Sequence, residues 1–133
     1  LESSPNIAYI DSKYPLCDTN LTMLESDILL NDYSTTSVDF SILRRPQIFC
    51  MPDYDIYKNT KGFLEDYKQS MPGQEVISFI SFCDTVKKSI EATSSYLKKY
   101  DDKRITILDK YYNLNDNNSS ANHKKFIDGI MRN

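Results

Sequence analysis

The most regular pattern of apolar positions lies between residues 75 and 100. Apolar or small side chains recur there at steps of three and four residues, the spacing of one face of an α-helix. The pair Pro72-Gly73 precedes the pattern as a start signal, and Asp101-Asp102 ends it. The pattern predicts a long helix whose core residues are Phe79, Cys83, Val86, Ile90 and Leu97.

A shorter helix is predicted over residues 60–71, with Phe63, Leu64, Tyr67 and Met71 on its apolar face. The segment SMPGQ joins it to the longer helix over 75–100, so the two predict an antiparallel helical hairpin. We therefore expect a mainly α fold, a small helical bundle built on this hairpin.

The flanking segments carry weaker patterns. Asp18, Thr19 or Asn20 can cap a helix that continues to about Leu29. Residues 38–42 alternate as in a strand and 47–51 form a second extended piece, although either can be an ordered loop. The segment RITILDKYYNL fits a helix or a strand, and a last helix is expected over 121–131.

The organisation expected is one domain over residues 1–133. A length of 133 residues suits a single hydrophobic core. Residues 1–17 and 113–120 are expected to be loops or extended segments, and the first residue, Leu1, suggests a fragment or a processed chain.

Two isoleucines do not follow the stripe of the long helix. Ile77 and Ile80 project to its flank, more than about 100° from the centre of the stripe. Either the flank is covered by the segment around Leu21, Leu24 and Ile28, or it is open and a protein partner covers it. Burial within the chain is the preferred interpretation, and Ile77 and Ile80 are the candidate partner-binding residues.

Composition changes this picture only at the margins. The chain is 40% hydrophobic and 26% charged, with a formal net charge of −3. Such a charge argues against a protein whose main task is to neutralise phosphates. Lysine and arginine doublets such as Lys98-Lys99 nevertheless keep open a winged-helix nucleic-acid-binding domain. No apolar run approaches the roughly 20 residues that cross a bilayer.

No catalytic, cofactor or metal site is predicted. The single histidine, His123, lies among polar residues, and the three cysteines, Cys17, Cys50 and Cys83, lack the close pairs of a local zinc site. The three glycines are scattered and form no phosphate-binding loop. We therefore expect no enzymatic activity.

Residues 63–88, FLEDYKQSMPGQEVISFISFCDTVKK, resemble the middle of regulator-of-G-protein-signalling (RGS) domains. In that family an aromatic-containing helix is followed by a turn and a helix in which Ile77, Phe79, Cys83 and Lys87 match the expected places. Ile80 stands where that family has tryptophan. The resemblance implies binding to a Gα subunit.

Together these observations favour a non-enzymatic helical interaction or scaffold module. We expect a subunit or domain of a eukaryotic intracellular assembly, cytoplasmic or nuclear, whose partner is another protein. An RGS-like domain and a winged-helix-like nucleic-acid-binding domain are the alternatives.

Overall fold

The computed structural model describes residues 18–63, 66–112 and 118–131 of the chain. Within these ranges three parallel strands form a sheet in the order β1 (Leu29–Asn31), β2 (Gln47–Cys50), β3 (Gln74–Val76). Leu29 lies opposite Gln47, and Ile48 lies opposite Gln74. The fold is therefore an α/β arrangement around a short parallel sheet.

Helical segments connect the strands, as parallel pairing requires. The helices α2 (Thr36–Phe40) and η1 (Ser41–Leu43) join β1 to β2, and α3 (Tyr54–Thr60) and α4 (Tyr67–Ser70) join β2 to β3. The first helix, α1 (Thr19–Glu25), precedes β1, and the Asp18 side chain caps it by accepting from the Asn20 N–H at 2.8 Å.

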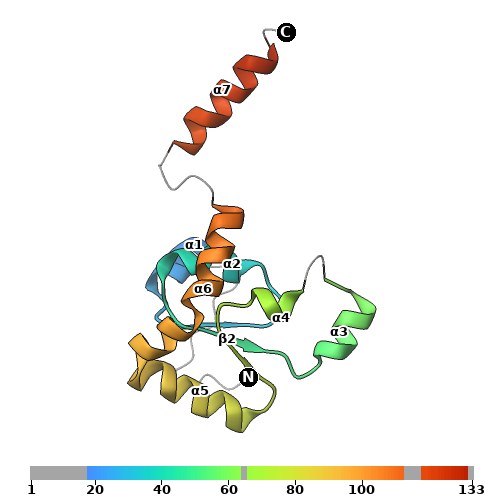
Figure 1. Cartoon of the computed structure of the whole chain (residues 1–133), viewed down its shortest axis with the longest axis vertical. Helices are drawn as coiled ribbons and strands as arrows, with labels where there is room; N and C mark the ends of the chain where they lie inside the picture. The colour runs from blue at the N-terminus through green and yellow to red at the C-terminus, as the bar shows by residue number, and fades with distance from the viewer. Residues whose placement is uncertain (1–17, 64–65, 113–117, 132–133) are drawn as a thin grey trace.

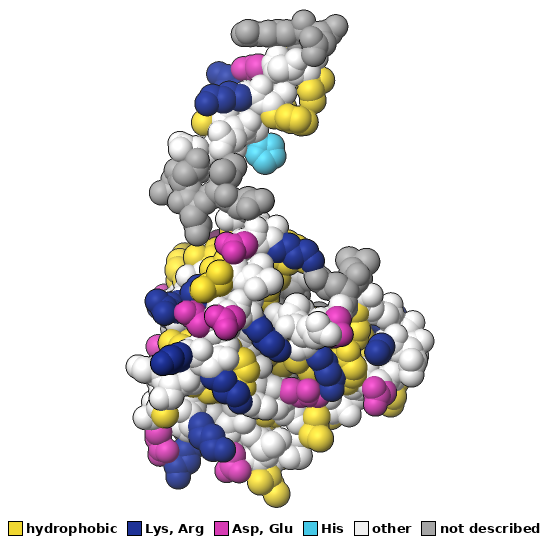
Figure 2. Space-filling view, viewed as in Figure 1, with side chains coloured by type: hydrophobic (Ala, Val, Ile, Leu, Met, Phe, Trp, Pro, Cys, Tyr) yellow, Lys and Arg dark blue, Asp and Glu magenta, His cyan; other side chains and the backbone are white. Residues whose placement is uncertain are grey.

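Three helices follow the sheet: α5 (Phe79–Glu91), α6 (Thr93–Tyr111) and α7 (Ser119–Met131). Helix α5 contacts β2 and β3, and α6 contacts α2, η1 and α4. Figure 1 shows α6 running along the body while α7 extends away from it. In the same view, Figure 2 shows basic and acidic side chains interleaved over the body.

The core lies around the central strand. Ile48 and Phe49 are fully buried, which is typical of a strand covered on both faces. Phe49 packs with Met51 and Met71, and Tyr33, Tyr54 and Tyr67 pack against this cluster. The loop after β1 and the helices after β2 thus pack against the central strand, β2.

The predicted small helical bundle is wrong. Residues 75 and 76, predicted to begin the long helix, belong to β3, and the rest of the predicted helix is split at Ala92 into α5 and α6. The pair Pro72-Gly73 turns the chain into a three-residue strand, too short to show an alternating pattern. Because the shorter predicted helix over 60–71 is reduced to α4, the helical hairpin does not exist.

Of the other predicted elements, some are confirmed by the structure and others are wrong. The extended piece at 47–51 is confirmed as β2, and the last helix, expected over 121–131, is confirmed as α7. The alternation at 38–42 belongs to α2 and η1, so the strand predicted there is wrong. Of the loops expected at 1–17 and 113–120, only residues 118–120 are described, and Ser119–Ser120 already belong to α7.

The predicted core stripe does not form the core. Phe79 is 78% exposed, Ile90 is 63% exposed and Cys83 is exposed, while Val86 and Leu97 are only half-buried. Helix α5 instead buries Thr85 and Ser89, one turn apart on another face. Small side chains let the helix backbone approach β2 and β3, so close contact with the sheet, not hydrophobicity, selects the buried face.

Ile77 and Ile80 are 66% and 76% exposed. The preferred interpretation, burial of this flank within the chain, is therefore wrong for the described residues. Their role as a partner-binding surface remains a prediction.

Candidate functional site

The loop after β1 carries a dense set of hydroxyl groups at the carboxyl edge of the sheet. Residues 31–37, NDYSTTS, run from the last residue of β1 through this loop into the first turn of α2. The Asn31 side-chain amide donates to the Ser34 carbonyl at 2.8 Å, and the Thr36 N–H donates to Ser34 Oγ at 3.2 Å. These local bonds, typical of Asn and Ser in turns, hold the loop in one conformation. Thr35 makes no side-chain capping bond.

A second set of contacts joins this loop to the elements after β2. The Tyr33 hydroxyl donates to Asp53 Oδ1 at 2.7 Å, and the Tyr67 hydroxyl donates to the Asp32 carbonyl at 2.6 Å. Asp53 lies just beyond the carboxyl end of β2, and Tyr67 begins α4. The carboxyl ends of two neighbouring strands and α4 are therefore tied together.

The protonation state of these tyrosines follows from their surroundings. Burial raises the pKa of Tyr33, and the Asp53 carboxylate, through its hydrogen bond and its charge, raises it further. Burial also raises the pKa of Tyr67, as does the nearby charge of Asp32. Both hydroxyls are therefore protonated donors at neutral pH, not candidate bases.

Aromatic rings form a continuous wall beside the loop. Tyr33 stacks on Tyr57 with ring centroids 4.0 Å apart, and Tyr57 stacks on Phe63 at 5.2 Å. Phe63 in turn stacks on Tyr67 at 4.9 Å and on Tyr54 at 5.4 Å. The wall connects α3, α4 and the loop after β1.

A hollow of about 430 Å³ opens between this wall, the loop after β1 and α6. We call it the aromatic hollow. Ser34 and Thr35 line it from the loop, and Tyr57, Phe63 and Tyr67 line it from the wall. Helix α6 contributes polar and charged side chains, namely Asp102, Lys103, Thr106 and Lys110. In open parallel sheets, ligands bind at the carboxyl ends of the strands, where this hollow begins.

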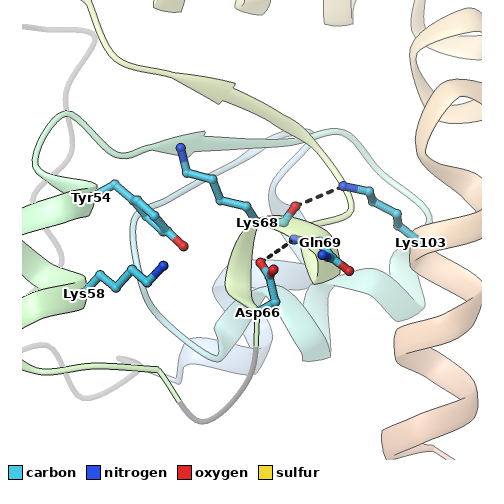
Figure 3. A pocket seen from close by; sticks show the side chains of 6 residues that line it. All are labelled: Tyr54, Lys58, Asp66, Lys68, Gln69 and Lys103. Atoms are coloured by element: carbon cyan, nitrogen blue, oxygen red, sulfur yellow. Dashed lines mark hydrogen bonds between the residues drawn. The ribbon is translucent and has the colours of Figure 1, made fainter.

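A second hollow of about 560 Å³ adjoins the first and shares Gln69 and Lys103 with it. We call it the basic hollow, because Lys58, Lys68 and Lys103 line it together with Tyr54, Asp66 and Gln69. Figure 3 shows Tyr54 and Lys58 reaching in from α3, and Lys103 reaching in from α6. Lys103 Nζ donates to the Lys68 carbonyl at 3.1 Å, which joins α6 to α4.

The residues discussed as possible sites in the sequence lie elsewhere. His123 is on α7, exposed, with its Nδ1 atom 3.3 Å from the Ser119 carbonyl. Cys50 and Cys83 are free thiols, and Cys17 lies outside the described residues. Among the residues that the structure places, no group of three or more His, Cys, Asp or Glu side chains could hold a metal ion.

Both hollows were missed by the sequence analysis. For the aromatic hollow, a signal was present in ILLN followed at once by DYSTTS, a short apolar run that ends in a hydroxyl-rich turn. No residue of this segment lines the basic hollow. We interpreted this run as the end of a helix. The aromatic wall and the three lysines come from separate segments, and only the folded chain brings them together.

The comparison with known proteins decides the family. Residues 2–128 match the family of CDP-glycerol:poly(glycerophosphate) glycerophosphotransferases. The chain belongs to this family. A teichoic acid glycerol-phosphate transferase from Staphylococcus aureus is 36% identical to it over 98 residues, which are 73% of the chain and 24% of that relative.

Further relatives agree. A teichoic acid glycerol-phosphate primase from Bacillus subtilis is 29% identical over 121 residues, covering 90% of the chain and 28% of the relative. A solved structure of a variant of the wall teichoic acid polymerase TagF superimposes with a TM-score of 0.72 at 27% identity, covering 99% of the chain and 32% of that structure. The chain thus spans only about a quarter of the length of the glycerol-phosphate transferase and of the primase.

The family membership corrects the functional prediction. The relatives are bacterial transferases and polymerases, so the expected eukaryotic scaffold or complex subunit is wrong. The RGS-like and nucleic-acid-binding alternatives fall with it, because the match covers nearly the whole chain and the RGS resemblance covers residues 63–88 only. The prediction of no enzyme is likewise wrong, since the family is one of enzymes. In the part of the chain that the structure describes, no helix is long and apolar enough to cross a membrane.

Proposed function

We propose that this chain contributes the donor-binding part of a glycerophosphotransferase, and that the aromatic hollow holds a cytidine-diphosphate-linked polyol such as CDP-glycerol. The observation that carries this proposal is the position of the hydroxyl-rich loop 31–37, at the carboxyl end of β1 and in the wall of the hollow. The family description, which names CDP-glycerol, supports the same class of donor.

The hollow offers what phosphate groups require. Ser34 and Thr35, which carry hydroxyl groups, line it from the loop, and Lys103 and Lys110, which carry ammonium groups, line it from α6. Catalysis of phosphoryl transfer depends mainly on positioning and on stabilising the charge of the phosphate oxygens. We assign these residues to holding the diphosphate, with the aromatic side chains of the wall beside the less charged parts of the donor.

The chemistry that this donor supports is a substitution at phosphorus. A hydroxyl oxygen of the acceptor forms a bond to the phosphorus that bears the glycerol, and the bond from that phosphorus to the bridging oxygen of the diphosphate breaks. Cytidine monophosphate leaves, and the hydroxyl proton is lost. Positive charge beside the bridging oxygen stabilises the leaving group, which is the role proposed for the lysines of α6.

Thr35 tests this proposal because its side chain lines the hollow and makes no capping bond. We expect Thr35→Val to weaken CDP-glycerol binding about tenfold, since a hydrogen bond to a charged group contributes roughly 1.5–3 kcal/mol. Isothermal titration calorimetry measures the change. Thr19→Val, at the exposed start of α1, is the matched control and should bind as the parent does. Equal binding by Thr35→Val and the parent would contradict the proposed site.

An intracellular location belongs to this proposal. Nucleotide-linked donors such as CDP-glycerol are made inside cells, so an enzyme that consumes one works where the donor is made. The nuclear half of the predicted location has no support from relatives that are bacterial.

A further inference from the structure

The basic hollow is built from three elements that converge on one space. Lys58 comes from α3, Lys68 and Gln69 come from α4, and Lys103 comes from α6. Figure 3 shows these side chains around the space between α3 and α4. On an ordinary solvated helix face, neighbouring lysines belong to the same helix. Here the fold brings together Lys58 and Lys103, which are 45 residues apart in the sequence.

The three lysines differ in how free they are. Lys68 Nζ lies 2.6 Å from Glu75 Oε1 and 4.2 Å from the centre of the Tyr54 ring, so its position is set by both neighbours. The Lys103 ammonium group donates one of its three N–H hydrogens to the Lys68 carbonyl, so two remain for a ligand. Lys58 makes no ion pair with any residue that the structure describes.

The remaining lining residues suit hydroxyl groups more than a second phosphate. Asp66 Oδ1 accepts the Gln69 N–H at 3.2 Å, which leaves its other oxygen for a donor from a ligand. The Gln69 amide and the Tyr54 hydroxyl can also bind hydroxyl groups. The three lysines bring three positive charges to the hollow, while Asp66 in its lining and Glu75 beside Lys68 bring two negative ones, so the net positive charge is small. It matches the single negative charge of a phosphodiester better than the larger charge of a nucleotide diphosphate.

We propose that the basic hollow binds a phosphodiester, with its neighbouring hydroxyl groups, in a growing polyol-phosphate chain, which makes it an acceptor subsite beside the donor site. This inference rests on the proposed function, because it takes the aromatic hollow as the donor site. The shared residues Gln69 and Lys103 place the two ligands next to each other, as transfer between them requires.

Lys58 is the residue to change, because it is exposed and makes no ion pair that folding could need. Lys58→Gln removes its charge and Lys58→Glu reverses it. Lys61→Gln is the matched control: Lys61 is the C-cap residue of the same helix, three residues on, and does not line the hollow. The full chain is titrated separately with a synthetic glycerol phosphate oligomer and with CDP-glycerol, at two salt concentrations.

We expect Lys58→Gln to weaken oligomer binding about threefold and Lys58→Glu about tenfold, as for exposed ion pairs. The salt dependence of oligomer binding should become shallower, because fewer counterions are released. Lys61→Gln should leave oligomer affinity within about twofold of the parent. CDP-glycerol affinity should be the same in all four proteins.

The two proposals fail in different ways. Oligomer binding that is absent, or unchanged by both Lys58 substitutions, overturns the acceptor subsite while CDP-glycerol binding keeps the donor site. An equal loss of affinity for CDP-glycerol in Lys58→Gln also overturns it, because the hollow would then belong to the donor. Oligomer binding without CDP-glycerol binding overturns the proposed donor site instead.

Discussion

Gly73 lies immediately before β3 and against the backbone of β2. A Cβ atom at this position would come within 2.0 Å of the Gln47 carbonyl oxygen and 3.0 Å of Phe49 Cε2. The obstacle is backbone, which cannot rotate away as a side chain can. The absence of a side chain at one residue is therefore what allows β3 to pair with β2.

We expect Gly73→Ala to reduce the free energy of unfolding by about 3 kcal/mol, the upper range for forcing extra atoms into a packed site. Gly129→Ala is the control, since nothing lies within 4 Å of a Cβ there. In the interior of α7 it should be neutral or increase helix stability by up to about 1 kcal/mol. Urea unfolding measures both. A Gly73→Ala protein as stable as the parent would show that β3 does not approach β2 this closely.

At the scale of elements, Tyr96 attaches α6 to the sheet. Its hydroxyl donates to the Gln47 carbonyl at 2.6 Å and accepts the Gln74 N–H at 3.0 Å, so one side chain joins the first residues of β2 and β3. Tyr100, one turn later, donates to Gln74 Oε1 at 2.6 Å. Burial raises the pKa of Tyr96 to about 12, although the Gln74 N–H acts in the opposite direction.

This raised pKa predicts a loss of stability in alkaline solution. Below pH 10, the ordinary pKa of tyrosine, both folded and unfolded chains keep the proton and the contribution of Tyr96 is complete. Between pH 10 and about 12 the unfolded chain loses the proton that the folded chain keeps, so the free energy of unfolding falls as the pH rises.

Tyr96→Phe tests both the contact and the titration. At neutral pH we expect it to cost about 1–3 kcal/mol, because two backbone groups lose their partner. Its stability should then fall less steeply than that of the parent between pH 10 and 12, measured by urea unfolding at each pH. The comparison of slopes is needed because Tyr112, whose pKa is also raised to about 12, titrates in the same range. Parallel slopes would contradict the assignment to Tyr96.

At the scale of the whole molecule, the large apolar side chains at the start of α5 lie outside the core, which forms around β2. Ile77, Phe79 and Ile80 are all more than 60% exposed, whereas Phe49 and Ile48 are fully buried. The buried hydrophobic core that stabilises the fold therefore lies around β2 and the elements packed against it. Ile77, just before α5, and Ile80, in its first turn, lie outside this core.

We expect the doubly substituted protein Ile77→Asp/Ile80→Asp to unfold cooperatively, with a free energy of unfolding within about 0.5 kcal/mol of the parent. Phe49→Ala, by contrast, should cost roughly 3–5 kcal/mol, as truncation of a buried phenylalanine does. Thermal and urea unfolding give both values. Loss of cooperative unfolding in the double variant would restore the interpretation that this flank is buried within the chain.

Some features were readable from sequence because they depend on neighbours along the chain. Asp18 caps α1 through the Asn20 N–H two residues away. The segment QIFC forms β2 and is buried at its first three residues, and the periodicity of residues 121–131 is that of α7. In each case the residues that make the structure are the residues that carry the pattern.

Only the tertiary structure decided the rest. A strand as short as β3 exists because Gly73 admits it beside β2, and α5 turns Thr85 and Ser89 inward because the sheet accepts small side chains at that distance. The two hollows combine a loop after one strand, rings from two helices and lysines from three. Residues that line the aromatic hollow are up to 78 positions apart in the sequence, from Tyr33 to Tyr111. Local periodicity contains no information about such contacts, since they form only when parallel strands bring the ends of separate segments to one edge.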